Sequence, residues 1–105
     1  GEGIGVAVDV YHVWWDPDLE SQINRAADRI LAYHVCDWLV PTTDLLLDRG
    51  MMGDGVIDIP LISKWVDGTG YDGLIEAEIF SAKNWWKRSS EEVIRTCRER
   101  IVTAV

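Results

Sequence analysis

The chain has 105 residues, 48% of them hydrophobic and 27% charged, which fits one small globular domain and excludes a disordered segment. Its net charge of −8 excludes the basic face that binds a nucleic-acid backbone. No apolar run approaches the roughly 18 residues of a membrane span, and residues 1–4 do not begin a signal peptide. We therefore expect one domain over residues 1–105, with neither nucleic acid nor membrane as a partner.

The first half of the chain predicts two buried strands separated by a helix. Apolar residues run through 4–10 and again through 30–35, as in strands of a parallel sheet. Between them, Asp16 and Pro17 predict the N-cap and first turn of a helix.

The second half predicts a long connection, a helix and a third strand. Residues 36–58 form the connection, in which 41–49 predict a short helix closed by Gly50. A further helix begins at Pro60, and residues 74–80 predict the third strand. A connection of this length in a compact domain is usually functional.

The chain ends in a predicted helix that reaches about Val105. Ser89, with Glu92 three residues later, predicts a capping box at its start. Four residues at helical spacing are expected to face inward: Val93, Cys97, Ile101 and Ala104. The order strand, helix, strand, helix, strand, helix predicts an α/β fold with a parallel sheet.

Each predicted strand carries a potential metal ligand near its end. Asp9 ends the first strand, with His12 three residues later. His34 ends the second strand and Glu78 lies in the third. Because the carboxyl ends of parallel strands share one rim, these side chains are expected to converge. Carboxylate and imidazole ligands suit Mn, Co, Mg or Zn better than a thiolate-bound metal.

Taken singly, these residues also have structural interpretations. Asp9 suits a turn or a helix cap, and His34 suits a hydrogen-bonded histidine inside a strand. Glu76 and Glu78 alternate on one strand face among apolar residues, where carboxylates need partners. We expect Glu76 to form an ion pair and Glu78 to be the ligand. The joint occurrence of Asp9, His34 and Glu78 at three successive strand ends nevertheless favours a metal site.

Together these motifs resemble the sugar phosphate isomerase/epimerase family. This xylose-isomerase-like barrel group includes ketose 3-epimerases, hydroxypyruvate isomerases and inosose dehydratases. The resemblance covers essentially all 105 residues and rests on four stretches: Asp9-Val10-Tyr11-His12, the strand end at His34, the turn Gly53-Asp54-Gly55, and Tyr71-Asp72-Gly73 with Glu78-Ile79-Phe80. It implies a (β/α)8 TIM barrel of about 250 residues. This chain would supply the C-terminal three βα units, an incomplete barrel.

The resemblance also implies a role for individual residues. Asp9, His34 and Glu78 would bind a divalent metal ion, and a fourth ligand, a glutamate on the fifth barrel strand, would lie outside this chain. Glu78 would also be catalytic as an acid or base. His12 would be catalytic and would contact the substrate, which Arg49 would also bind.

The implied activity is isomerisation or epimerisation of a sugar, a sugar phosphate or a small hydroxy-carbonyl compound through an enediolate. Two alternatives stay open: an inosose-dehydratase-like lyase on the same barrel, and a catalytically silent fragment or interaction module. An endonuclease IV type of activity, which cleaves DNA with three zinc ions, is disfavoured. That branch carries a histidine where this chain has Gly50 after Asp48-Arg49, and the chain is acidic.

Substrate and partner assignments depend on the aromatic and basic loops. Trp38, with Trp14 and Trp15, would form either an apolar wall under a sugar ring or a subunit interface. Lys83 or Arg88 would bind a substrate phosphate, unless their loop is solvated and packs on a neighbour.

Assembly and compartment follow from the strand count and the cysteines. Three strands cannot close a barrel, so we expect either a homo-oligomer or association with the remainder of the barrel. The two widely separated cysteines, Cys36 and Cys97, predict free thiols in a cytoplasmic protein.

Overall fold

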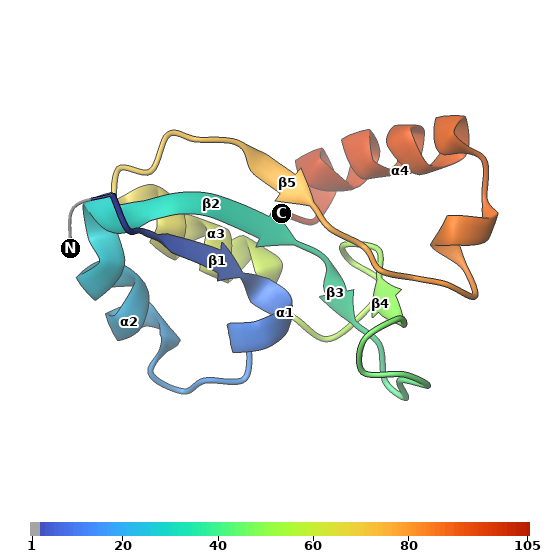
Figure 1. Cartoon of the computed structure of the whole chain (residues 1–105), viewed down its shortest axis with the longest axis horizontal. Helices are drawn as coiled ribbons and strands as arrows, with labels where there is room; N and C mark the ends of the chain where they lie inside the picture. The colour runs from blue at the N-terminus through green and yellow to red at the C-terminus, as the bar shows by residue number, and fades with distance from the viewer. Residues whose placement is uncertain (1–2) are drawn as a thin grey trace.

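The computed structural model describes residues 3–105 and contains a three-stranded parallel sheet in the order β1-β2-β5 (Figure 1). The strands are β1 (Val6–Asp9), β2 (Ile30–Val35) and β5 (Ile75–Ala77). Asp9 pairs with His34, and His34 pairs with Glu76. The predicted α/β class with a parallel sheet is confirmed.

Two helices cover one face of this sheet, α2 (Leu19–Ala26) and α3 (Ile59–Gly68) (Figure 1). Their apolar sides join the strands in one core, in which Ile23 and Ile62 are buried. Tyr33 on β2 reaches α3, where its hydroxyl lies 2.8 Å from the hydroxyl of Ser63. The central strand β2 is therefore the most buried of the three strands.

The first predicted strand, 4–10, is too long at both ends. β1 stops at Asp9, and the chain turns at once into the short helix α1 (Val10–Val13). The carboxylate of Asp9 accepts a hydrogen bond of 2.9 Å from the backbone N–H of Tyr11 and so caps α1. His12 consequently lies on a helical turn directly above the strand end.

The start of the first predicted helix, at Asp16 and Pro17, is wrong. α2 begins at Leu19 with Asp18 as its N-cap, and Asp18 makes no side-chain capping bond. Asp16 instead accepts the backbone N–H of Asp18 at 2.9 Å. This is a local turn that such side chains form readily. After α2, the 3₁₀ turn η1 (Ala27–Arg29) leads into β2.

The short helix predicted over residues 41–49 is also wrong. The connection instead forms an antiparallel ribbon of β3 (Asp37–Trp38) and β4 (Arg49–Gly50). Between these strands, the Asp44 carboxylate accepts the backbone N–H groups of Leu46 and Leu47. These are the bonds of a helix N-cap, but the turn ends at Leu47 because the backbone of Leu47 and Arg49 bonds to Ala82 and Phe80 instead of continuing the helix.

The third predicted strand is shorter than 74–80, since β5 ends at Ala77 and Glu78 follows it. The chain continues through the 3₁₀ turn η2 (Trp85–Lys87) into α4 (Ser90–Thr103). The Ser89 hydroxyl caps α4 by accepting the N–H of Glu92, as predicted. The reciprocal half of the capping box is not formed, because Glu92 pairs with Arg88 at 2.7 Å instead.

α4 packs less closely than predicted. Its expected inward residues contact the core but none is fully buried: Val93, Cys97, Ile101 and Ala104. Between α4 and β5 lies an open apolar groove of about 530 Å³, lined by Ile75, Ile94 and Val102 among others. Figure 1 shows α4 to one side of the sheet. Within residues 3–105, no helix is both long and apolar enough to cross a membrane.

Candidate metal centre

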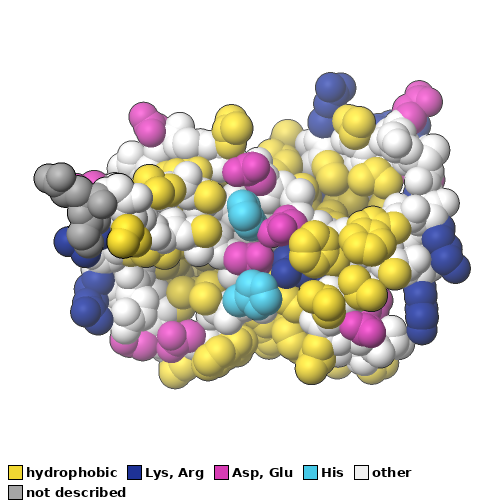
Figure 2. Space-filling view, in the orientation of Figure 1, with side chains coloured by type: hydrophobic (Ala, Val, Ile, Leu, Met, Phe, Trp, Pro, Cys, Tyr) yellow, Lys and Arg dark blue, Asp and Glu magenta, His cyan; other side chains and the backbone are white. Residues whose placement is uncertain are grey.

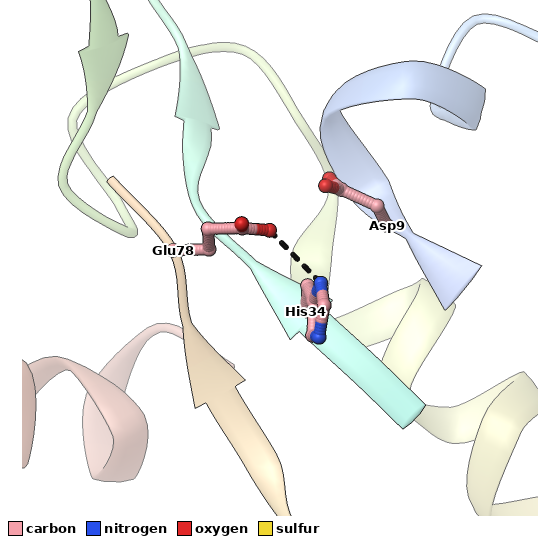
Figure 3. Close-up of side chains that lie close together, drawn as sticks. All are labelled: Asp9, His34 and Glu78. Atoms are coloured by element: carbon pink, nitrogen blue, oxygen red, sulfur yellow. Dashed lines mark ion pairs between the residues drawn. The ribbon is translucent and has the colours of Figure 1, made fainter. Parts of the chain in front are cut away.

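Three of the predicted ligands meet at the carboxyl ends of the three parallel strands (Figure 3). Asp9 ends β1, His34 lies near the end of β2, and Glu78 follows β5. Each offers one ligand atom, and these atoms lie within 4.8 Å of one another. His34 Nδ1 is 2.9 Å from a Glu78 carboxylate oxygen. The group is half-buried, with side-chain exposures of 14% for Asp9, 27% for His34 and 34% for Glu78.

The donor set fits a divalent cation. Two carboxylates and one imidazole within this span suit Zn, Mn, Co or Mg. The nearby thiol of Cys36 is not part of the group. Burial raises the pKa of the Cys36 thiol to about 12, so it stays protonated at neutral pH. The site therefore offers oxygen and nitrogen ligands and no thiolate.

The expectation for Glu76 is met only loosely. Its carboxylate lies 3.8 Å from Nε2 of His34 and its side chain is 54% exposed. Glu78, by contrast, is at hydrogen-bonding distance from the other ring nitrogen of His34. The two glutamates therefore approach the same histidine from different sides, and Glu76 lies outside the three-residue group.

Arg49 is buried beside the ligands. Its side chain is 3% exposed, and Nη1 donates to Asp9 Oδ2 at 3.2 Å and to the backbone carbonyl of Glu78 at 3.3 Å. The guanidinium lies between two rings, 4.4 Å from the centroid of Tyr11 and 4.7 Å from that of Phe80. Arg49 thus connects two of the candidate ligands and is itself enclosed by aromatic rings.

His12 lies next to Arg49 on the open side of the cluster. Its Nε2 is 3.3 Å from Nη2 of Arg49 and 3.9 Å from Asp9 Oδ2. The His12 side chain is 65% exposed, so it can meet a ligand entering from solvent. Figure 2 shows both histidines with acidic side chains on one face, beside apolar side chains.

The remaining predicted substrate residues lie farther out. The Trp38 ring stacks on Tyr11 at 4.7 Å and tilts against Trp14 at 5.8 Å, while Trp15 is 65% exposed. Lys83 is exposed, and its charge helps to lower the pKa of the Asp44 carboxyl after the larger effect of backbone hydrogen bonds. The Asp44 carboxylate would therefore compete with a phosphate for Lys83.

Sequence reasoning missed three residues that hold the site in place. Tyr11 and Phe80 enclose Arg49, and the Tyr11 hydroxyl also donates to the backbone carbonyl of Leu45 at 3.1 Å. Asp37, which is fully buried, accepts four backbone N–H groups at 2.8 to 3.0 Å. For Asp37, the available signal in the sequence was a charged residue within an apolar stretch, since charged groups need partners when they are buried.

Solved structures share this architecture. Protein SMc04130 of Sinorhizobium meliloti matches with a TM-score of 0.97 and 61% identity, over 99% of this chain and 38% of that one. The IolI protein, whose crystal structure contains a bound zinc atom, matches with a TM-score of 0.79 and 24% identity, over 96% and 37%. At that identity, the likeness to IolI shows the fold alone.

A curated relative and a family model extend the comparison. An inosose isomerase of Bacillus licheniformis is 27% identical over 111 residues, which cover 99% of this chain. The chain spans about 38% of the length of that relative. The model described as the xylose isomerase-like TIM barrel matches residues 2–99, nearly the whole chain. The chain therefore belongs to the xylose isomerase-like TIM barrel family.

Proposed function

We propose that this chain forms part of the active site of a divalent-metal-dependent isomerase or epimerase that acts on a sugar, a sugar phosphate or a small hydroxy-carbonyl compound. The observation that carries the proposal is the convergence of Asp9, His34 and Glu78 at the ends of three parallel strands. Family membership and the inosose isomerase relative support the reaction class.

The proposed ligands are Asp9, His34 and Glu78. Asp9 is already oriented, because its two oxygens accept bonds from the N–H of Tyr11 and from Arg49. His34 is held by its position in the central strand. A bound divalent ion would polarise the substrate carbonyl and stabilise the negative charge of an enediolate.

Glu78 has a second proposed role, as an acid or base. Its carboxylate lies at the rim and is one-third exposed, so it can reach a substrate carbon while staying beside His34. In that position Glu78 would remove or return the proton that moves between neighbouring carbons. The resemblance places a second glutamate for the opposite step outside this chain, so the proposed proton-transfer machinery is half present.

The exposed apolar strands support the proposal that these are the last three βα units of a larger barrel. The outer strands leave Val6 42% and Ile75 41% exposed, and Leu74 before β5 is 76% exposed. Both edges of the described sheet are unpaired. Exposed apolar edges invite pairing, so we propose that the remainder of the barrel or a second copy continues the sheet.

Compartment and substrate contacts complete the proposal. Cys36 and Cys97 are free thiols, which supports a reducing, cytoplasmic setting. His12 and Trp38 lie on the open side of the cluster or next to it and are the proposed substrate contacts. Arg49 is 3% exposed and is better placed to orient Asp9 than to meet a substrate.

A Mn²⁺ titration by calorimetry tests the metal site directly. The chain should bind Mn²⁺, and Glu78→Gln and His34→Ala should each weaken binding at least about tenfold, because each removes one ligand from a small set. Glu76→Gln is the matched control, since it alters the neighbouring glutamate, two residues earlier in β5, and should change affinity only slightly. Equal losses for Glu76→Gln and Glu78→Gln would contradict the ligand assignment.

Turnover is a separate test. With Mn²⁺ and the remainder of the barrel present, the assembled protein should convert an inosose or a ketose into an isomer of the same mass, which NMR of the products identifies. A dehydrated product would instead establish a lyase on the same barrel. Metal binding without turnover of any ketose by the assembled barrel would refute the isomerase assignment.

A further inference from the structure

The contact between Arg49 and His12 determines more than position. The Arg49 guanidinium has N–H donors and no acceptor, and it keeps its charge at every accessible pH. Its Nη2 is 3.3 Å from Nε2 of His12. A hydrogen bond at this distance requires Nε2 to be the acceptor. A neutral imidazole with an acceptor at Nε2 carries its proton on Nδ1.

We infer that Arg49 is a positioning residue that fixes His12 as the Nδ1–H tautomer, so that His12 offers an incoming oxygen ligand a hydrogen-bond donor at Nδ1. While the contact with Arg49 lasts, the Nε2 lone pair of His12 is occupied and does not accept a substrate proton. Proton transfer then belongs to Glu78, and His12 orients an oxygen atom. The statement that this oxygen belongs to a substrate rests on the proposed function.

The surroundings of both residues support this assignment. Asp9 Oδ2 is the only carboxylate oxygen near Nε2 of His12 within residues 3–105, but at 3.9 Å it lies beyond hydrogen-bonding distance. That same oxygen accepts Nη1 of Arg49 at 3.2 Å. The nearest carboxylate is therefore engaged by Arg49, and the guanidinium itself faces the histidine nitrogen.

Arg49 is held rigidly enough to impose this preference. Tyr11 and Phe80 lie 4.4 and 4.7 Å from its planar group, and the two N–H donors of Nη1 are shared among Asp9 Oδ2, Glu78 O and, at 3.7 Å, Cys36 Sγ. An arginine with several fixed bonds cannot turn Nη2 away without breaking them. His12, at 65% exposure, has Nδ1 free of hydrogen bonds to any residue in 3–105. The free donor is thus available to a ligand.

Nitrogen NMR of the histidine rings tests the inference without any need for activity or metal. The chain contains two histidines, so a His12→Asn variant identifies the His12 signals. The spectra are recorded at about pH 8, above the ordinary histidine pKa of about 6.5. In the folded chain with chelator present, Nε2 of His12 should resonate as an unprotonated nitrogen and Nδ1 as a protonated one. Both should shift towards averaged positions when urea unfolds the chain.

An Arg49→Met variant tests the part played by the arginine. It should keep the fold by circular dichroism and shift the two His12 nitrogens towards the positions of the unfolded chain. Arg100→Met is the matched control, because Arg100 also bonds a carboxylate and a carbonyl, those of Asp54 and Met52, but lies on α4. That control should leave the His12 signals unchanged.

Each outcome decides the inference. A protonated Nε2 in the folded wild-type chain overturns it, even if Arg49→Met fails to fold. An unchanged His12 spectrum in a folded Arg49→Met variant also overturns it. The expected spectrum together with no metal binding would leave this inference standing and would remove the proposed function instead.

Discussion

Asp37 should contribute more to stability than any other single carboxylate in the described chain. It is fully buried, and its Oδ1 accepts the backbone N–H groups of Trp38 and Ile57, while Oδ2 accepts those of Gly53 and Gly55. In Asp37→Asn, one oxygen keeps its two bonds and the new NH₂ group faces two N–H donors. Each buried donor left without an acceptor costs about 1–3 kcal/mol, so the free energy of unfolding should fall by about 2–6 kcal/mol.

Urea unfolding followed by tryptophan fluorescence measures this loss, since the chain has six tryptophans. Asp44→Asn is the matched control: its carboxylate also accepts two backbone N–H groups, at 2.8 and 2.9 Å, but on an exposed loop. Both bonds run to Oδ1, which Asn keeps as its amide oxygen, and the loop is open to water, so the urea midpoint should shift much less. A loss below about 1 kcal/mol for Asp37→Asn, or equal shifts in the two variants, would refute the reasoning.

Two further predictions concern packing and alkaline pH. Gly55→Ala should lower the free energy of unfolding by about 1–3 kcal/mol or more, because the new methyl group would overlap the carbonyl of Trp38. In Gly68→Ala, the control, the methyl group meets nothing within 4 Å, so a thermal melt should show a neutral or slightly stabilising effect. Burial raises the pKa of Tyr33 and of Cys36 to about 12, above their ordinary values, so both stay neutral in the folded chain while they ionise in the unfolded chain. Stability should therefore be intact below about pH 8 and fall as the pH rises towards 12. The urea midpoints at about pH 8 and 10.5 should differ less for Tyr33→Phe than for the unchanged chain. A midpoint of the unchanged chain that is independent of pH would contradict this.

The regular part of the fold was predictable because its signals are local. Apolar runs bounded by helix starts predicted the three parallel strands and their alternation with helices. The same order implied that strand ends share a rim, which was enough to propose that Asp9, His34 and Glu78 converge. Helix boundaries were less predictable, since Asp16 and Asp18 are both good caps and only packing selects between them.

The connection over residues 36–58 could not be predicted in the same way. Its shape depends on contacts distant in sequence, such as the bonds from Gly53, Gly55 and Ile57 to Asp37. No periodic sequence pattern predicts that a carboxylate will accept hydrogen bonds from backbone N–H groups about twenty residues away. The role of Arg49 was obscured for a similar reason, because its partners come from four separate segments: β1, α1, the residue after β2 and the chain after β5.

These two unpredicted features explain each other. β4 places Arg49 beneath the rim only because β3 pairs with it, and the same segment pairs with the chain after β5, where the Arg49 N–H donates to Phe80 O at 2.9 Å. The segments that follow β2 and β5 are thereby joined by backbone hydrogen bonds, and Asp37 anchors the first of them. A buried arginine needs partners for its donors, and Nη1 and Nη2 have them here, while Nε has none among the described residues. The connection thereby places the Arg49 guanidinium beside the rim, where it bonds Asp9 at 3.2 Å and meets His12 Nε2 at 3.3 Å.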